Sequence, residues 1–351
     1  MTNSEQIIMA HGSGGEMMRE LIAKYFVSAY GAAELKTGDD SAVVTLTAPD
    51  QPSQGQQLAF KLAFTTDSYV VTPLFFSGGD IGRLAVSGTV NDLATSGATP
   101  LYLSVAFILE EGLPLATLEA ICASIAATAA EAKVSIVTGD TKVVPHGKGD
   151  GIYINTAGVG AFNNQQPLSG RFCQPGDKIL VSGTLGDHGV AILAARETLS
   201  FQAEIASDVA PLNHLVKQVL HAAPQTRCFR DPTRGGLAAT INELASQSQT
   251  SMTIDEAAVP VKVAVRGAAE MLGLDIFQIA NEGKMVAVVP PDQAESALAA
   301  MQADPLGRDA AIIGEVREAP PPGLPAAWLR TALGATRVLD MLVGEQLPRI
   351  C

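Results

Sequence analysis

The run LYLSVAFIL, residues 101–109, is apolar at every position except Ser104 and predicts a buried strand. Before it, residues 80–96 have a helical pattern, with Asp80 as the expected N-cap and Gly97 as the stop. After it, apolar residues recur at helical spacing from residue 118, at positions 121, 122, 125, 126 and 129. The spacing places Cys122 on an apolar face, where we expect an inert core residue.

Further strands are predicted on both sides of this unit. Residues 42–46 and 58–65 precede it, separated by a Pro-, Gln- and Ser-rich loop, and residues 134–138 and 152–160 follow it. The segments 37–39 and 138–140 are both Thr-Gly-Asp, and each is interpreted as a strand-edge turn that presents a carboxylate. Alternation of this kind predicts one compact α/β domain over residues 1–165.

A second α/β domain is predicted over residues 166–340, after a Pro- and Gly-containing linker at 162–176. Its elements are strands at 178–182, 285–289 and 311–316, helices at 189–197 and 213–222, and a helix that begins at Leu237. Residues 341–351 offer little to pack and are predicted to form a mobile tail.

The composition limits the classes of function. Among 351 residues, 47% are hydrophobic, which supports a sizeable core, and the net charge is −13. An acidic surface repels phosphate backbones and anionic lipids, so we expect neither nucleic-acid nor membrane binding. The N-terminus lacks the pattern of a signal peptide, the apolar stretch 120–130 is too short to span a bilayer, and no Cys-x-x-Cys pair is present. A cytoplasmic protein is expected.

Several carboxylates lie in Gly-rich or apolar surroundings, where burial requires a partner such as a cation. They are Asp39, Asp40, Asp67, Asp92 and Asp140. Each alone is better explained as a turn former or helix cap. Together, carboxylates from separate elements favour Mg²⁺ held between a protein and nucleotide phosphates.

Five further features could carry chemistry, although for the first four a structural role is at least as good an explanation. The Gly-rich run at 11–15 could turn backbone amides toward an anion. Lys142 and the lysine of the 281–284 turn could neutralise phosphate or act as bases. The turn at 231–236 could hold phosphate with its amides. Finally, Cys351 could react at the end of a mobile arm, and by itself it is unexplained.

In this order, these segments resemble the HypE family of hydrogenase maturation proteins, which is related to aminoimidazole ribonucleotide synthetase, selenophosphate synthetase and thiamine-monophosphate kinase. The resemblance covers essentially the whole chain and departs from the family pattern at none of these positions. Its motifs are HGSGG (11–15), GDD (38–40), TTDS (65–68), NDL (91–93), TGDTK (138–142), DPTRGG (231–236), EGK (282–284) and PRIC (348–351). The last motif distinguishes this family from its relatives.

The resemblance implies a ferredoxin-like N-terminal half that dimerises through its sheet, and a reaction on the last residue. A partner carbamoyltransferase loads a carbamoyl group onto Cys351. ATP then phosphorylates the amide oxygen, and loss of phosphate leaves a thiocyanate. The cyano group passes to iron on a maturation scaffold complex for the [NiFe] hydrogenase centre. ATP and Mg²⁺ are the implied cofactors.

The resemblance also implies roles for individual residues. Cys351, Lys142 and Glu282 are the expected catalytic set, with Lys142 and Glu282 as the pair that removes the amide protons. Mg²⁺ and the phosphates are assigned to Asp40, Asp67 and Asp92. The remaining expected nucleotide-binding residues are Asp39, Asn91, Asp140, Gly14 and Gly15.

Two other functions remain open at this point. A sister enzyme of the same superfamily would phosphorylate a free small molecule and have no use for Cys351. A non-catalytic carrier would bind ATP only as a structural ligand and present its thiol to partners.

Overall fold

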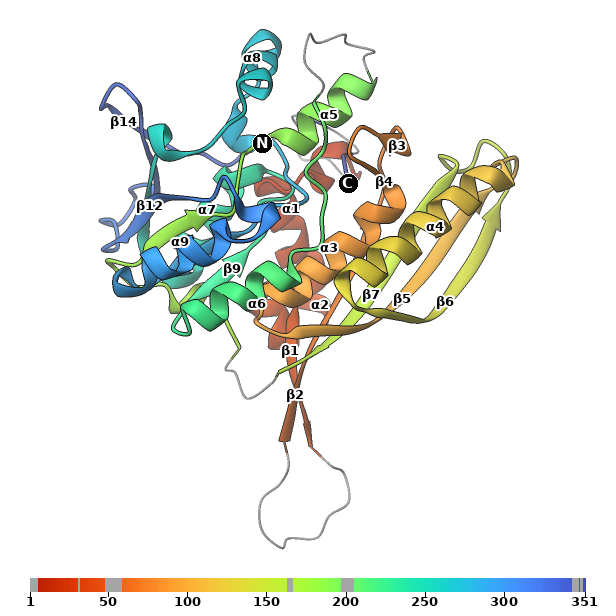
Figure 1. Cartoon of the computed structure of the whole chain (residues 1–351), viewed down its shortest axis with the longest axis horizontal. Coiled ribbons are helices and arrows are strands. Elements are labelled where there is room, and N and C mark those ends of the chain that lie inside the picture. The colour runs from red at the N-terminus through yellow and green to blue at the C-terminus, as the bar shows by residue number, and fades with distance from the viewer. Residues whose placement is uncertain are drawn as a thin grey trace, which may run out of the picture.

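The structure, a computed structural model, describes residues 6–30, 32–47, 59–162, 167–196, 205–342, 347 and 350–351. It is a mixed α/β protein with two large sheets, as predicted (Figure 1). The domain boundary predicted between residues 165 and 166 falls outside the described residues.

The first sheet has the strand order β1-β2-β7-β5-β6. Only β5 and β6 are parallel, and α4 makes the crossover between them. The helices α3 and α4 pack together along one face of the sheet (Figure 1). The strands are β1 (Ala42–Thr47), β2 (Ala59–Tyr69), β5 (Thr99–Glu110), β6 (Ser135–Val144) and β7 (Ile152–Ala161), and the helices are α3 (Ile81–Thr95) and α4 (Leu115–Ala132).

The expected start and end of α3 are confirmed. The Asp80 carboxylate accepts hydrogen bonds from the amides of Gly82 and Arg83, at 2.7 and 3.1 Å. At the other end Gly97 has φ +84°, the left-handed conformation that a glycine adopts without strain. The cap and the glycine therefore set where α3 begins and ends, and with that the position of Asp92 along it.

Two predictions about the first half were wrong, and one helix is longer than predicted. The helix predicted from residue 118 begins at Leu115, and Cys122 is exposed rather than buried. Its buried face is formed by Ile121, Ile125, Thr128, Ala129 and Ala132, so position 122 lies just beyond the edge of this face. By length and composition alone α4 could cross a membrane, but its buried face packs against α3 and the sheet. The Thr-Gly-Asp at 138–140 is not a turn, because β6 continues through it to Val144.

The second sheet has the order β14-β13-β10-β12-β8-β11-β9 and carries helices around it. Its strands are β8 (Lys178–Val181), β9 (Cys228–Arg230), β10 (Ser251–Asp255), β11 (Val286–Val289), β12 (Ala311–Arg317), β13 (Ala327–Arg330) and β14 (Thr336–Val338). Its helices are α5 (Asp187–Arg196), α6 (Asn213–Ala222), α7 (Gly236–Ser248), α8 (Val263–Leu272) and α9 (Ala294–Gln302). The predicted strands and helices of this half are present, and β9, β10, β13, β14, α8 and α9 are additional to them.

Short elements complete the chain. Near the N-terminus they are α1 (Glu16–Leu21), a π-helix (Ile22–Val27) and α2 (Ser28–Tyr30), and a two-stranded ribbon of β3 (Phe75–Phe76) and β4 (Gly79–Asp80) precedes α3. The 3₁₀ turns are Met9–Gly12, Glu34–Lys36, Gly170–Phe172, Glu256–Ala258, Ile276–Gln278, Pro291–Gln293 and Pro305–Gly307.

The described end of the chain is packed, contrary to the expectation that it offers little to pack. Ile350 is buried in the core of the first half, and Leu347 contacts the cores of both halves. In Figure 1 the C-terminus lies beside α5 and the β3–β4 ribbon. Leu347, Ile350 and Cys351 therefore lie between the two halves.

Candidate active site

The two halves meet at a narrow cleft that contains carboxyl groups, an arginine and the last residue of the chain. We call it the carboxylate cleft, and it is lined by Asp67, Ser68, Tyr69, Gly88, Asp92, Asp231, Thr233, Arg234, Glu282 and Cys351. Asp67 lies near the end of β2, Asp92 comes from α3, and the other charged groups come from loops of the second half. Residues that are far apart in the sequence, from Asp67 to Cys351, therefore line one small cleft.

Burial dominates the electrostatics of the cleft. It raises the pKa of Asp67, Asp92 and Glu282, and neighbouring carboxylates raise the pKa of the last two further. For Asp231, burial raises the pKa from 3.8 to about 6 despite the opposing effect of Arg230. Carboxyl groups crowded in this way hold their protons more strongly than exposed carboxyl groups do, and a bound cation would oppose that effect.

Cys351 lies at the centre of these groups. Burial raises the pKa of its thiol well above 9.0, and Arg234 opposes that rise, while Glu282 and Asp67 add to it. The thiol is therefore neutral in this position. The influence is mutual, since Cys351 is the strongest influence raising the pKa of the Arg234 guanidinium.

Tyr69 is a cleft residue that the sequence did not single out. Its hydroxyl bonds to Asp67 and lies 3.4 Å from the Thr89 hydroxyl. Gly88 of α3 allows Tyr69 to approach closely, because a Cβ at Gly88 would overlap the Tyr69 hydroxyl oxygen. The glycine thus makes room for a cleft side chain.

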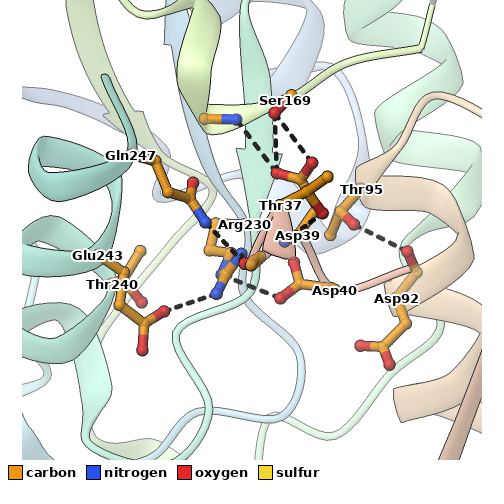
Figure 2. Close-up of polar contacts among 12 residues, drawn as sticks. Thr37, Asp39, Asp40, Asp92, Thr95, Ser169, Arg230, Thr240, Glu243 and Gln247 are labelled. Carbon is orange, nitrogen blue, oxygen red and sulfur yellow. Dashed lines mark hydrogen bonds and ion pairs between the residues drawn. The ribbon is translucent and has the colours of Figure 1, made fainter. Parts of the chain in front are cut away.

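A second cluster surrounds Arg230 next to the cleft (Figure 2). Arg230 forms ion pairs with Asp40 at 2.9 Å and with Glu243 at 2.6 Å. Asp39 points the other way and accepts a hydrogen bond from the Ser169 hydroxyl at 2.9 Å. Among the described residues, Asp40 Oδ2 is buried without a hydrogen-bond partner, and burial raises the pKa of this carboxyl.

Thr65 connects the two clusters. Its hydroxyl lies 2.9 Å from Asp92 Oδ2 and 3.0 Å from the backbone oxygen of Asp40. Asp40 also raises the pKa of Asp92. Within the described ranges, no group of three or more His, Cys, Asp or Glu side chains forms a ready-made metal site. A cation here would need ligands from another molecule as well, as Mg²⁺ bound to phosphates does.

Asn91 is placed otherwise than expected. Its side-chain NH₂ donates to Ala210 O at 3.1 Å, and its Oδ1 accepts from Leu212 N at 2.7 Å. Both polar ends of this buried amide are therefore used to fasten α3 to the second half.

Lys142 and Asp140 lie far from Glu282 within one chain. They form an ion pair with each other at 2.6 Å, with side chains 69% and 64% exposed. On β6 they pair with Ile108 and Ala106, whose side chains lie on the sheet face opposite α3. Three strand spacings, about 14 Å, also separate β6 from β2 and its Asp67. A single chain does not bring Lys142 into the cleft.

The N-terminal Gly-rich segment adjoins the cleft. Gly12 and Ser13 line a cavity of about 770 Å³ that also contains Arg234 and Cys351. Gly14 and Gly15 do not line it. A Cβ at Gly14 would come within 2.6 Å of the backbone oxygen of Arg234, so these glycines allow the segment to pack closely.

The arrangement of two such halves around an acidic cleft is that of the AIR synthase related proteins. Residues 38–162 match the AIR synthase related protein N-terminal domain, and residues 174–324 match the C-terminal domain of the same family.

Comparison with individual proteins is more specific. The carbamoyl dehydratase HypE of Cupriavidus necator is 51% identical over 348 residues, covering 99% of this chain and 95% of that protein. A crystal structure of a HypE–HypF complex superimposes with a TM-score of 0.83 at 42% identity, covering 92% of this chain and 99% of that one. A crystal structure of HypE in complex with ATP has a TM-score of 0.79 at 47% identity, covering 99% and 100%. The chain belongs to the HypE family of carbamoyl dehydratases.

Proposed function

We propose that this chain dehydrates a carbamoyl group carried on the thiol of Cys351, in an ATP-dependent reaction that leaves a thiocyanate. The observation that supports this most directly is the position of that thiol, inside the carboxylate cleft between Arg234 and Glu282. An enzyme acting on a free small molecule would have no reason to place the end of its own chain there.

The chemistry requires that the amide oxygen leave and that two N–H protons be removed. ATP supplies the phosphoryl group that turns the oxygen into a leaving group. Glu282 is the proposed base, because its raised pKa makes its ionised form a stronger proton acceptor than an exposed glutamate. Arg234 stabilises negative charge that develops beside the sulfur.

The acidic residues fit a magnesium–nucleotide complex. Asp40, Asp67 and Asp92 are the proposed ligands of Mg²⁺, and Asp39 lies in the adjoining Arg230 cluster. The buried, unbonded oxygen of Asp40 and the raised pKa values of all three carboxyls support a cation at this point. A bound cation would offset the cost of burying these charges and the repulsion among neighbouring carboxylates.

The neighbouring cavity is the proposed nucleotide site. Its volume of about 770 Å³ lies within the usual range for a bound small molecule. The segment His11–Gly12–Ser13 lies along it, with Gly14 and Gly15 supporting that segment through packing. A HypE relative has been crystallised in complex with ATP.

The raised pKa of Cys351 explains why the end of the chain has to move. A thiolate is the nucleophile in carbamoyl transfer, and burial in the cleft suppresses the thiolate. We therefore propose that a carbamoyltransferase partner loads the thiol outside the cleft, in keeping with the HypE–HypF complex of a relative. An iron-carrying scaffold is the proposed acceptor, and the cytoplasm is the proposed compartment. Residues 1–165, 166–340 and 341–351 are the proposed domains and mobile tail.

A homodimer would give Lys142 and Asp140 a role in the reaction. The sheet face that carries them also exposes Phe60, Phe64, Tyr102 and Ile108. An uncovered apolar sheet face of this kind is typical of an interface between subunits. We propose that this face pairs with a second copy and that Lys142 and Asp140 serve the cleft of the partner subunit.

The decisive experiment measures the intact mass of the C-terminal peptide after incubation with Mg-ATP, the carbamoyltransferase and its carbamoyl donor. We expect a carbamoyl adduct on Cys351 that loses the mass of one water only when ATP is hydrolysable. A loaded thiol that never loses water would support the carrier function instead. ATP consumption on a small molecule, with unmodified Cys351, would support the sister-enzyme function.

A further inference from the structure

The buried histidine of α5, His188, touches the end of the chain. Its Nε2 lies 2.6 Å from the backbone oxygen of Ile350, and its Nδ1 lies 2.8 Å from the Ser207 hydroxyl. The ring is fully buried and packs edge-on against Phe76 of β3, with centroids 5.6 Å apart. Neither the sequence motifs nor the proposed chemistry assigns this residue a role.

The hydrogen bonds determine which nitrogen of His188 carries the proton. The Ser207 hydroxyl oxygen accepts from Val209 N at 3.1 Å, so its own hydrogen is available for His188 Nδ1. The proton is then on Nε2, which donates to the Ile350 carbonyl. Burial lowers the pKa of His188 and keeps the ring neutral, as this arrangement requires.

The contact controls the position of Cys351 because the Ile350 carbonyl belongs to the peptide group that includes the nitrogen of Cys351. Apolar packing adds to it, since Ile350 is buried and Leu347 contacts both cores. Gly189 follows the histidine, and a Cβ there would lie 3.2 Å from a Leu347 methyl carbon and 2.5 Å from Ile279. The start of α5 is thus shaped to receive the end of the chain.

We propose that His188 is a positioning residue that recognises the C-terminal peptide and holds Cys351 in the carboxylate cleft, with Ser207 fixing its tautomer. The role of His188 in the reaction cycle rests on the proposed function, whereas its hold on the chain end follows from the observed contacts alone. It divides the reaction cycle into two parts. Loading requires the His188–Ile350 bond to break, and dehydration requires it to form.

Two matched variants test the bond. In His188→Gln the side-chain amide can donate from about the place of Nε2, whereas in His188→Asn it matches Nδ1 and does not reach Ile350. Alkylation of Cys351 by iodoacetamide, followed by peptide mass spectrometry, reports how often the thiol leaves the cleft. Exposed Cys122 serves as the internal reference, and buried Cys173 and Cys228 report that the fold is intact.

We expect His188→Asn to raise the alkylation rate of Cys351 about five- to tenfold relative to Cys122, because one buried hydrogen bond is lost. His188→Gln should stay within about twofold of the wild type, since its donor is retained. Carbamoyl loading by the partner should be unimpaired in His188→Asn, while water loss from the loaded thiol slows. Equal alkylation rates in the wild type and both variants would overturn the proposal.

The two proposals fail in different ways. If the wild type dehydrates its loaded thiol, and His188→Asn matches it in both alkylation and dehydration, the role of His188 is refuted and the function stands. If the wild type never dehydrates the loaded thiol, yet Asn and Gln separate as expected in alkylation, the function is refuted and the role of His188 stands.

Discussion

At the scale of single residues, the cleft concentrates carboxyl groups at a cost to the folded state. Asp92 is partly buried, and its pKa is raised by burial and by Asp231, Asp40 and Asp67. An amide of the same shape removes this repulsion but provides a poorer ligand for a cation. Stability and function therefore respond in opposite directions to the same substitution.

We predict that Asp92→Asn abolishes ATP-dependent water loss from the loaded Cys351 while it raises the melting temperature of the nucleotide-free protein by about 2–4 °C at pH 7. Intact-mass analysis and thermal unfolding measure the two effects. Wild-type turnover by this variant would remove Asp92 from the metal ligands.

Asp231 gives a prediction about pH. Its pKa is 3.8 in an unfolded chain and about 6 in the fold, so between these values the folded state binds more protons than the unfolded state. Stability from this group is thus present at low pH and lost as the pH rises through about 6. The gain in melting temperature from Asp231→Asn should be near zero at pH 4 and grow toward pH 7. A gain that is constant with pH would contradict the raised pKa.

The sequence predicted part of this site. Asp67 and Asp92 could be chosen because carboxylates in apolar surroundings need a partner, and both are in the cleft. The sequence could not reveal that Arg234 faces Cys351 or that His188 meets Ile350, because each contact joins residues more than a hundred positions apart. Such pairs follow only from the packing of one half on the other.

At the scale of secondary-structure elements, capping and glycine positions decide how α3 serves the cleft. The Asp80 cap and Gly97 were readable from the sequence because they act within a few residues. Strand lengths were less predictable. β6 continues through Gly139 because its backbone lies close to β5, and a Cβ there would overlap the Val105 oxygen. Local composition alone indicated a turn at that place.

We predict that Gly88→Ala destabilises the protein by about 1–3 kcal/mol, because the added methyl group displaces the Tyr69 hydroxyl from Asp67. Tyr69→Phe removes the overlapping oxygen. A double-mutant cycle in urea unfolding should therefore show that Gly88→Ala costs less in the Tyr69→Phe background. Additive effects would show that the methyl group acts elsewhere.

At the scale of the whole molecule, the first sheet has one covered face and one open face. The open face carries aromatic and aliphatic side chains and also Lys142. In a monomer the apolar side chains of the open face would stay exposed to water, and Lys142 would have no cleft to act on. Assembly and catalysis are therefore linked in the proposal.

We predict that Phe64→Asp on the open face shifts the protein from dimer to monomer in analytical ultracentrifugation, because it places a charge in the apolar interface. Leu333→Asp is the matched control, since Leu333 is 98% exposed and lies in the second half. If the two variants sediment alike, this face is not the interface.

Mixing two inactive variants tests whether Lys142 acts on the partner subunit. Neither Lys142→Ala nor Glu282→Gln should dehydrate the loaded thiol alone. After subunit exchange at equal amounts, about a quarter of wild-type activity should return, because half of the dimers are mixed and each contains one intact site. No recovery, despite mixed dimers in native mass spectrometry, would place both residues in the same subunit.

The burial of Cys351 has a consequence for the protein's survival between reaction cycles. Peroxides attack the thiolate, and the cleft raises the pKa of this partly buried thiol and so keeps it protonated. An idle molecule waiting for its partner is thereby protected from oxidative damage at the one sulfur it requires. Exposed Cys122 offers no such shelter, so it should record oxidant exposure long before Cys351 is harmed.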